Sequence, residues 1–283
     1  DALTSLSLVR YNSADFSAAS KVAGTLVELG TQFASRRALA TGRMLEGLCS
    51  FATGRFREAQ QGLEEAVNLL SEGAEGTEAI QGRALVYLAV TLHILGRTAE
   101  ARSLVNAAIE LARHRRALDL AVTLGNSLYV FSLQSNIQQI RRIGEELERL
   151  AQEKGFLMWF HHARFFLAWA DTVEGDRSGL QQMEASMDRF RSAQEVVEQS
   201  FFYGLMAERY LAAGEIATAL KNAEMGLQLV RLYGERFHEI PLLAIKSRCL
   251  AASTGSDFGS EVSNLEDHIQ ALNIEFGETV WSS

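Results

Sequence analysis

Short breaks in the helical pattern recur along this chain at a nearly constant spacing. Consecutive breaks lie 39 to 42 residues apart, and apolar residues at the three- and four-residue spacing of amphipathic helices flank each one. The breaks are centred on Ser13, Gly54, Gly96, Asn136, Gly175, Gly214 and Gly255. A period of this length is typical of proteins that stack copies of one small unit, because each unit buries its apolar face against its neighbours.

The unit itself is predicted to be a pair of helices. Most of the breaks contain glycine, which adopts the left-handed conformation that ends a helix, while the longer loop at 71–76 has too little apolar content to pack. The chain has a single proline, Pro241, and is rich in helix-forming residues, so no strands are expected. We therefore predict an all-α fold, an α-α superhelix (solenoid) of about seven helical hairpins in one domain spanning 1–283.

Small residues recur at fixed distances from the breaks, which is the pattern that close packing of two helices requires. They stand five residues after a break (Ala18, Ala59, Ala101, Ala219), twelve after (Thr25, Ala66, Ala108, Gly226) and seven before (Gly47, Ala89, Ala168, Ala207). The hairpin around Asn136 departs from this pattern, with Tyr129 and Arg141 at two of the small positions. Gly175 is followed by Leu180 and Met187 at the small positions, so we expect that hairpin to pack more loosely.

These offsets resemble the signature of tetratricopeptide (TPR) repeats, although the unit is longer than the usual ~34 residues. Two stretches, 153–169 and 214–237, look like the C-terminal arrays of class III nucleotide cyclases that carry an AAA-type ATPase module. The chain is also similar to the sensor domain of maltose-regulon-activator-like, LuxR-type transcription regulators. These resemblances imply a signal-receiving domain of a larger bacterial protein, and since Asp1 lies within a helical pattern we expect the chain to be a fragment.

Residues arranged for catalysis or metal binding are not found in the sequence. No phosphate-binding loop of the GxxxxGK[ST] type occurs, no two histidines share a helix face at metal-ligand spacing, and the two cysteines, Cys49 and Cys249, are far apart. We therefore expect no enzyme activity, no cofactor and no metal. The net charge of -8 disfavours direct contact with nucleic acid, no stretch is long enough to span a membrane, and a reducing, cytoplasmic location fits best.

A binding groove is expected on the concave face, which stacked hairpins line with their first helices. Counting back thirteen, ten, six and three residues from each break selects one stripe per hairpin. From these stripes we predict a mixed polar and aromatic surface made of Arg83, His93, Asn126, His162, Phe165, Trp169, Phe201 and Glu208. An alternative for Phe165 and Trp169 is that they fill the core, which is also our expectation for Trp159.

Three functions remain open at this stage. The first is a regulatory interaction module that binds a protein or peptide partner on its concave face and acts on an output domain. The second is a sensor of a small polar ligand, bound by Trp169, His162, Asn126 and Arg83. The third is an oligomerisation scaffold, suggested by the apolar residues Ile274, Phe276, Val280 and Trp281 near the end of the chain.

Overall fold

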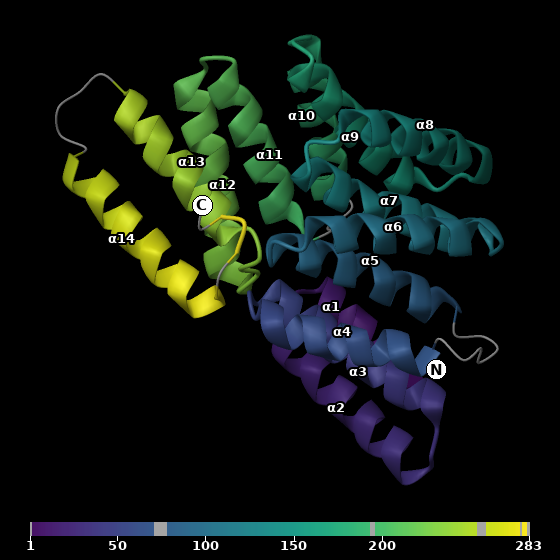
Figure 1. Ribbon diagram of the computed structural model, residues 1–283. Helices are drawn as coiled ribbons and strands as arrows, with labels where there is room; N and C mark the ends of the chain where they lie inside the picture. Colours follow the sequence, from purple (N-terminus) through teal and green to yellow (C-terminus); the bar gives the residue numbers. More distant parts are fainter. Residues whose placement is uncertain (1, 71–77, 193–195, 254–258, 278, 282–283) are drawn as a thin grey trace.

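The computed structural model describes residues 2–70, 78–192, 196–253, 259–277 and 279–281, and within these ranges it contains 14 helices and no strand. The predicted all-α solenoid is confirmed (Figure 1). In chain order the helices are α1 (Ala2–Asn12), α2 (Phe16–Gln32), α3 (Arg36–Ala52), α4 (Phe56–Leu70), α5 (Glu78–Ile94), α6 (Thr98–Arg113), α7 (Ala117–Leu133), α8 (Ile137–Lys154), α9 (Leu157–Val173), α10 (Ser178–Ser192), α11 (Gln199–Ala212), α12 (Ile216–Tyr233), α13 (Glu239–Ala252) and α14 (Gly259–Phe276). No helix in the described ranges is both long and apolar enough to cross a membrane.

The helices pair into hairpins, each odd-numbered helix with the even-numbered one that follows it. Each odd-numbered helix also packs against the next odd-numbered helix, from α1 through to α13. The odd-numbered helices therefore form a continuous inner layer, and the even-numbered helices cover it from outside. This is the arrangement of a two-layer α-α superhelix.

Six hairpins turn in the same way. In each turn one residue adopts the left-handed conformation, with φ between 50° and 99°, and the next N–H donates to the carbonyl five residues earlier at 2.8 to 2.9 Å. This is the Schellman motif, which closes the end of a helix. The left-handed residues are Ala14, Gly54, Gly96, Ser135, Gly175 and Gly214. The seventh break, at Gly255, and the loop expected at 71–76 lie outside the described residues.

Two of the predicted breaks are wrong by one residue. The left-handed residues are Ala14 and Ser135, whereas Ser13 and Asn136 stand beside them. Asn136 instead begins the next helix, since its Oδ1 accepts from the Gln139 N–H at 3.2 Å. In both turns the left-handed position holds a residue other than glycine, Ala14 or Ser135, and a residue typical of turns, Ser13 or Asn136, stands next to it.

The corrected register explains the irregular fourth hairpin. Counted from Ser135, the positions that pack between helices are Leu128 and Ile140, and both are fully buried. Tyr129 and Arg141 stand one residue further along, where Arg141 pairs with Asp171 at 2.9 Å. The hairpin therefore keeps the common packing positions but fills them with larger apolar side chains.

The superhelix curves until its second hairpin meets its last (Figure 1). The Arg236 N–H donates to the Ala52 carbonyl at 2.7 Å, and the Val280 N–H donates to the Ile94 carbonyl at 2.8 Å. Aromatic rings fill the junction, with ring centroids 4.9 Å apart for Phe51 and Phe237 and 5.6 Å apart for Phe56 and Phe276. These contacts join the last hairpin and its preceding connection to the second and third hairpins, across the inner layer.

Candidate functional site: a cavity inside the superhelix

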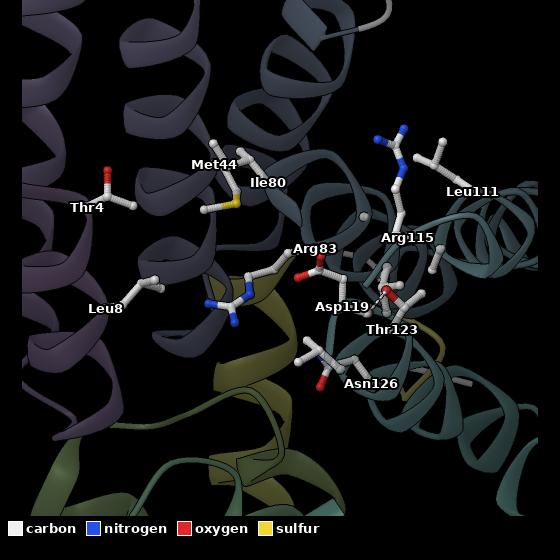
Figure 2. Close-up of a pocket in the computed structure, with 14 residues that line it drawn as sticks. Thr4, Leu8, Met44, Ile80, Arg83, Leu111, Arg115, Asp119, Thr123 and Asn126 are labelled. Atoms are coloured by element: carbon white, nitrogen blue, oxygen red, sulfur yellow. Dashed lines mark hydrogen bonds between the residues drawn. The ribbon is translucent and has the colours of Figure 1, made fainter. Parts of the chain in front are cut away.

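A cavity of about 420 Å³ lies inside the inner layer, a size within the range of pockets for small ligands. A smaller cavity of about 190 Å³ adjoins it and shares Arg83, Val122 and Asn126 with it (Figure 2). The walls of the larger cavity come from six odd-numbered helices, α1 to α11, from α10 and from the connection that precedes α11. Among them are Tyr11, Leu48, Arg83, Tyr87, Asn126, Tyr129, Trp159, His162, Glu198 and Phe202.

Glu198 is the acidic group of the larger cavity. It stands just before α11 in the left-handed conformation, with φ of 72°, which is unfavourable for a residue with a side chain. Its carboxylate accepts a hydrogen bond from the Tyr87 hydroxyl at 2.5 Å through one oxygen and from the Tyr129 hydroxyl through the other. These two bonds, from α5 and α7, hold the connection against the inner layer.

A second carboxyl, that of Glu235, lies behind Glu198. Its two oxygens accept from the Glu198 N–H at 2.7 Å and from the Ser200 hydroxyl at 3.0 Å. Burial raises the pKa of Glu235 to about 8, with the charge of Glu198 adding to the effect, and burial also raises the pKa of Glu198. The two connections that carry these acids are thus joined by a buried hydrogen-bond network.

His162 and Trp159 form another wall of the cavity. The His162 Nε2–H donates to the Gly125 carbonyl at 3.1 Å, and burial lowers the pKa of His162 to about 4, so the ring is neutral near pH 7. The Trp159 ring lies 5.3 Å from it, centroid to centroid. A Cβ at Gly125 would come within 2.3 Å of the Trp159 ring, so glycine is what allows Trp159 to lie here.

Two polar side chains of the cavity make no hydrogen bond and no ion pair in the part of the chain that the structure describes. Arg83 on α5 and Asn126 on α7 line both cavities, and within the described ranges neither side chain makes a hydrogen bond or an ion pair. Asn126 is only 6% exposed, whereas Arg83 is half-buried. Since nearly all buried polar groups are hydrogen-bonded in folded proteins, these two are the groups best placed to bind something from outside.

The structure separates the predicted groove residues into two groups. Arg83, Asn126 and His162 line the larger cavity, and Phe201 is buried beneath it, against Phe237. Phe165 and Trp169 are buried and line neither cavity. His93 lies near a hairpin turn, 3.1 Å from the Thr98 hydroxyl, and Glu208 pairs with Arg209 at 3.3 Å. A binding role for any of the eight stays a prediction.

Several wall residues were missed by the sequence reasoning. Tyr129 fell off the predicted stripe because of the one-residue error at Asn136, and Trp159 was assigned to the core. Glu198 and Glu235 lie in connections between hairpins, where no helical periodicity marks an inward-facing position. Among the described residues no group of His, Cys, Asp and Glu has the geometry of a metal site.

No known protein family matches this chain, and no curated protein is significantly similar to it in sequence. Among solved structures it is similar to the crystal structure of a Rap protein complexed with competence and sporulation factor. The TM-score is 0.69 over 95% of this chain and 73% of that chain, and the sequences are 11% identical. At this identity the likeness concerns the fold, and it supports a TPR-like helical repeat array. The resemblance to signalling ATPases and to LuxR-type regulators is not confirmed.

Proposed function

We propose that this chain is a non-catalytic regulatory module that binds a ligand inside its superhelix and passes the signal to an output domain of a larger cytoplasmic protein. The ligand is a short peptide or a small polar molecule. The observation that carries this proposal is the cavity inside the inner layer, which combines aromatic walls with two polar side chains that make no hydrogen bond in the described ranges. Pockets for small ligands have this composition, with a few polar groups that orient the ligand and apolar walls that bury it.

The chemistry of the walls supports binding over catalysis. His162 is neutral and uses its Nε2–H on a backbone carbonyl, and both oxygens of Glu198 are engaged by tyrosine hydroxyls. Neither group lies beside a cysteine thiol, since both cysteines are buried outside the larger cavity, and burial raises the pKa of the Tyr87 and Tyr129 hydroxyls, which keeps them protonated. The Rap protein with which this chain shares its fold was solved in complex with a factor, so the architecture is compatible with ligand binding.

The contacts of the C-terminal segment bear on the scaffold alternative. Of the four apolar residues that suggested oligomerisation, Phe276 and Trp281 pack against Phe56 within the same chain. Ile274 is 78% exposed. Internal closure of the superhelix accounts for two of these residues, and this favours the ligand-binding module over the scaffold.

Thermal unfolding in the presence of pooled short peptides and pooled metabolites tests the proposal. A ligand that binds only the folded state raises the unfolding temperature, by an amount that grows with the logarithm of the ratio of its concentration to Kd. Any pool that raises it is then titrated against tryptophan fluorescence, in the original protein and in Trp159→Phe and Trp169→Phe variants. We expect the signal to vanish in Trp159→Phe and to persist in Trp169→Phe. A signal that persists in both variants would place the ligand outside the cavity.

A further inference from the structure

We infer that Arg83 and Asn126 form a carboxylate-binding site, and that the ligand of the cavity joins a carboxylate to an apolar or aromatic group. This inference rests on the proposed function, because it specifies which chemistry the cavity selects. It depends on three observations. Arg83 makes no ion pair, the amide of Asn126 makes no hydrogen bond in the described ranges, and both carboxylate oxygens of Glu198 already accept hydrogen bonds.

Arg83 differs from the arginines that join neighbouring helices. Arg141 pairs with Asp171 across two hairpins, and Arg177 pairs with Glu215 at 2.6 Å. No carboxylate in the described ranges lies within ion-pair distance of Arg83. Asp119 lines the same small cavity (Figure 2), but its carboxylate accepts two hydrogen bonds from Arg116. The guanidinium of Arg83 is therefore available to an incoming anion, which it can bind through two parallel N–H donors.

Asn126, like Arg83, lines both cavities and so stands at their boundary (Figure 2). It is one helix further along the inner layer, and the residue is more than nine-tenths buried. Its amide makes no hydrogen bond in the described ranges and is open to the cavity, where a ligand can reach it. The amide offers both a donor and an acceptor, so it can contact a carboxylate oxygen or a peptide group next to it.

The acid of the cavity directs an anionic ligand toward Arg83. Both oxygens of Glu198 accept from tyrosine hydroxyls, and no ion pair joins this carboxyl to Arg83, although the charge of Arg83 opposes the effect of burial on the pKa of Glu198. A ligand carboxylate next to Glu198 would meet a like charge, whereas next to Arg83 it would meet an opposite one. Of the two groups, only Arg83 favours an anion.

The remaining walls define the other part of the ligand. Met158, Trp159, Phe190 and Phe202 line the larger cavity and present apolar surface to it. An aromatic or aliphatic group buried against these walls would contribute roughly 25 cal/mol for each Å² of apolar surface removed from water. A phosphate is less suited, since a dianion would have a single unpartnered arginine to bind and Asp119 close to it.

Affinity selection with matched ligand pools tests this site. The protein is incubated with five-residue peptides of random sequence, in one pool with a free C-terminal carboxylate and in another with a C-terminal amide. Acidic side chains are omitted from both pools, and a third pool holds N-acetylated amino acids with free carboxylates. Mass spectrometry identifies what co-elutes with the protein. We expect retention from the free-acid peptides, from the N-acetylated amino acids or from both, with aromatic members enriched. Retention from the amide pool should be at least tenfold lower.

Arg83→Met and Asn126→Asp keep the size of each side chain but remove the site, the second by placing a carboxylate beside Arg83. We expect about a tenfold or greater loss of affinity for the retained ligands in both, the effect of losing a hydrogen bond to a charged group. Arg102→Met, on an exposed position of α6, is the matched control and should retain the original affinity. Thermal unfolding confirms that each variant is folded.

The outcomes separate the two levels of the argument. Retention from the free-acid peptide pool alone identifies a peptide terminus, and retention from the N-acetylated pool alone identifies a small carboxylic acid; both support the site. Equal retention of amides, or retention unchanged in folded Arg83→Met and Asn126→Asp, overturns the carboxylate site and leaves the proposed function standing. If nothing is retained from any pool, the carboxylate site is wrong, and the proposed function then depends on the thermal unfolding experiment with pooled metabolites, which fails it only if no pool raises the unfolding temperature.

Discussion

The connections in this chain are of two kinds, and the difference between them shows how a repeat array acquires a specific interior. The six turns within hairpins are nearly identical in backbone and hydrogen bonding. The same turn recurs between hairpins at Ala34 and Gly155. The connections before α11 and α13, in their described parts, do not repeat it, and they carry Glu198, Glu235 and Phe237 into the interior. The regular turns stack the hairpins, whereas the irregular connections close the superhelix and build the walls of its cavity.

The two kinds of connection also differ in where their stability comes from. A hairpin turn is completed by local backbone hydrogen bonds, such as that from the Arg97 N–H to the Leu92 carbonyl at 2.8 Å. The interior connections depend on partners far away in sequence, including Tyr87 for Glu198 and Phe51 for Phe237. Changes in the interior connections should therefore cost more stability than changes in the turns.

The largest effect is expected for Phe237→Ala. Phe237 is 3% exposed, and its ring lies 4.9 Å from that of Phe51 and 5.8 Å from that of Phe201, centroid to centroid. Removing a buried phenylalanine ring costs about 3–5 kcal/mol, because apolar burial is lost and a cavity remains. Urea unfolding followed by circular dichroism measures the loss.

Phe33→Ala is the matched control, since Phe33 is 69% exposed at the end of α2. A surface substitution of this kind changes stability by at most about 0.5 kcal/mol. If the two variants lose similar amounts of stability, the junction between the second and last hairpins does not contribute to the fold, and the comparison between turns and interior connections breaks down.

A smaller and pH-dependent effect is expected for Glu235→Gln. The folded pKa of Glu235, about 8, lies above its ordinary value of 4.5, so the folded state holds a proton that the unfolded state releases. The stability from this group is complete below about pH 4.5 and is lost as pH rises toward 8, by at most about 1.4 kcal/mol per pH unit. The variant should therefore gain stability relative to the original protein between pH 5 and 8.

Urea unfolding at several pH values between 5 and 9 measures this difference, in which the contributions of histidines common to both proteins cancel. Glu145→Gln, at an exposed position on α8, serves as the control and should follow the pH dependence of the original protein. Parallel curves for Glu235→Gln and the original protein would show that Glu235 ionises in the interior without cost to the fold.

The same division between turns and interior connections explains what the sequence predicts. Hairpins are predictable because each turn is a local event, and glycine marks four of the six. At Ala14 and Ser135 the left-handed position holds a residue other than glycine, so the sequence does not mark it. The predicted register slips by one residue in these two hairpins. Arg83 and His162 were predicted to face inward because they lie on helices with a readable period, whereas Asn126 was selected in the slipped register and lines the cavity one residue away from the corrected stripe.

The interior connections were not predictable in this way. Glu198 and Glu235 would be assigned to solvent by residue type, because isolated acids are rarely buried. Their burial follows from how far the superhelix curves, which sums small rotations between neighbouring hairpins over the whole chain. No single segment of sequence contains this sum, so the meeting of Glu198 with Tyr87 and Tyr129 had no local signal.

The smallest effect, and the sharpest test of the division, compares Gly54→Ala with Gly96→Ala. Both glycines have φ of 81°, so alanine pays a similar conformational cost of about 1–2 kcal/mol at either site. At Gly96 a Cβ would meet nothing within 4 Å, whereas at Gly54 it would lie 2.7 Å from the ring of Phe276. Gly54→Ala should therefore lose more stability than Gly96→Ala by about 1–3 kcal/mol, the usual cost of overpacking.

The difference between these two variants isolates the contact between the second hairpin and the last, because the backbone strain is common to both. A third variant, Gly54→Ala with Phe276→Leu, makes room for the added methyl group. If the clash is the cause, this pair of changes should be less destabilising than the sum of the two single changes, which urea unfolding of all four proteins measures. Additive losses would mean that α14 moves freely away from Gly54, and that the closure of the superhelix is looser than its interior connections.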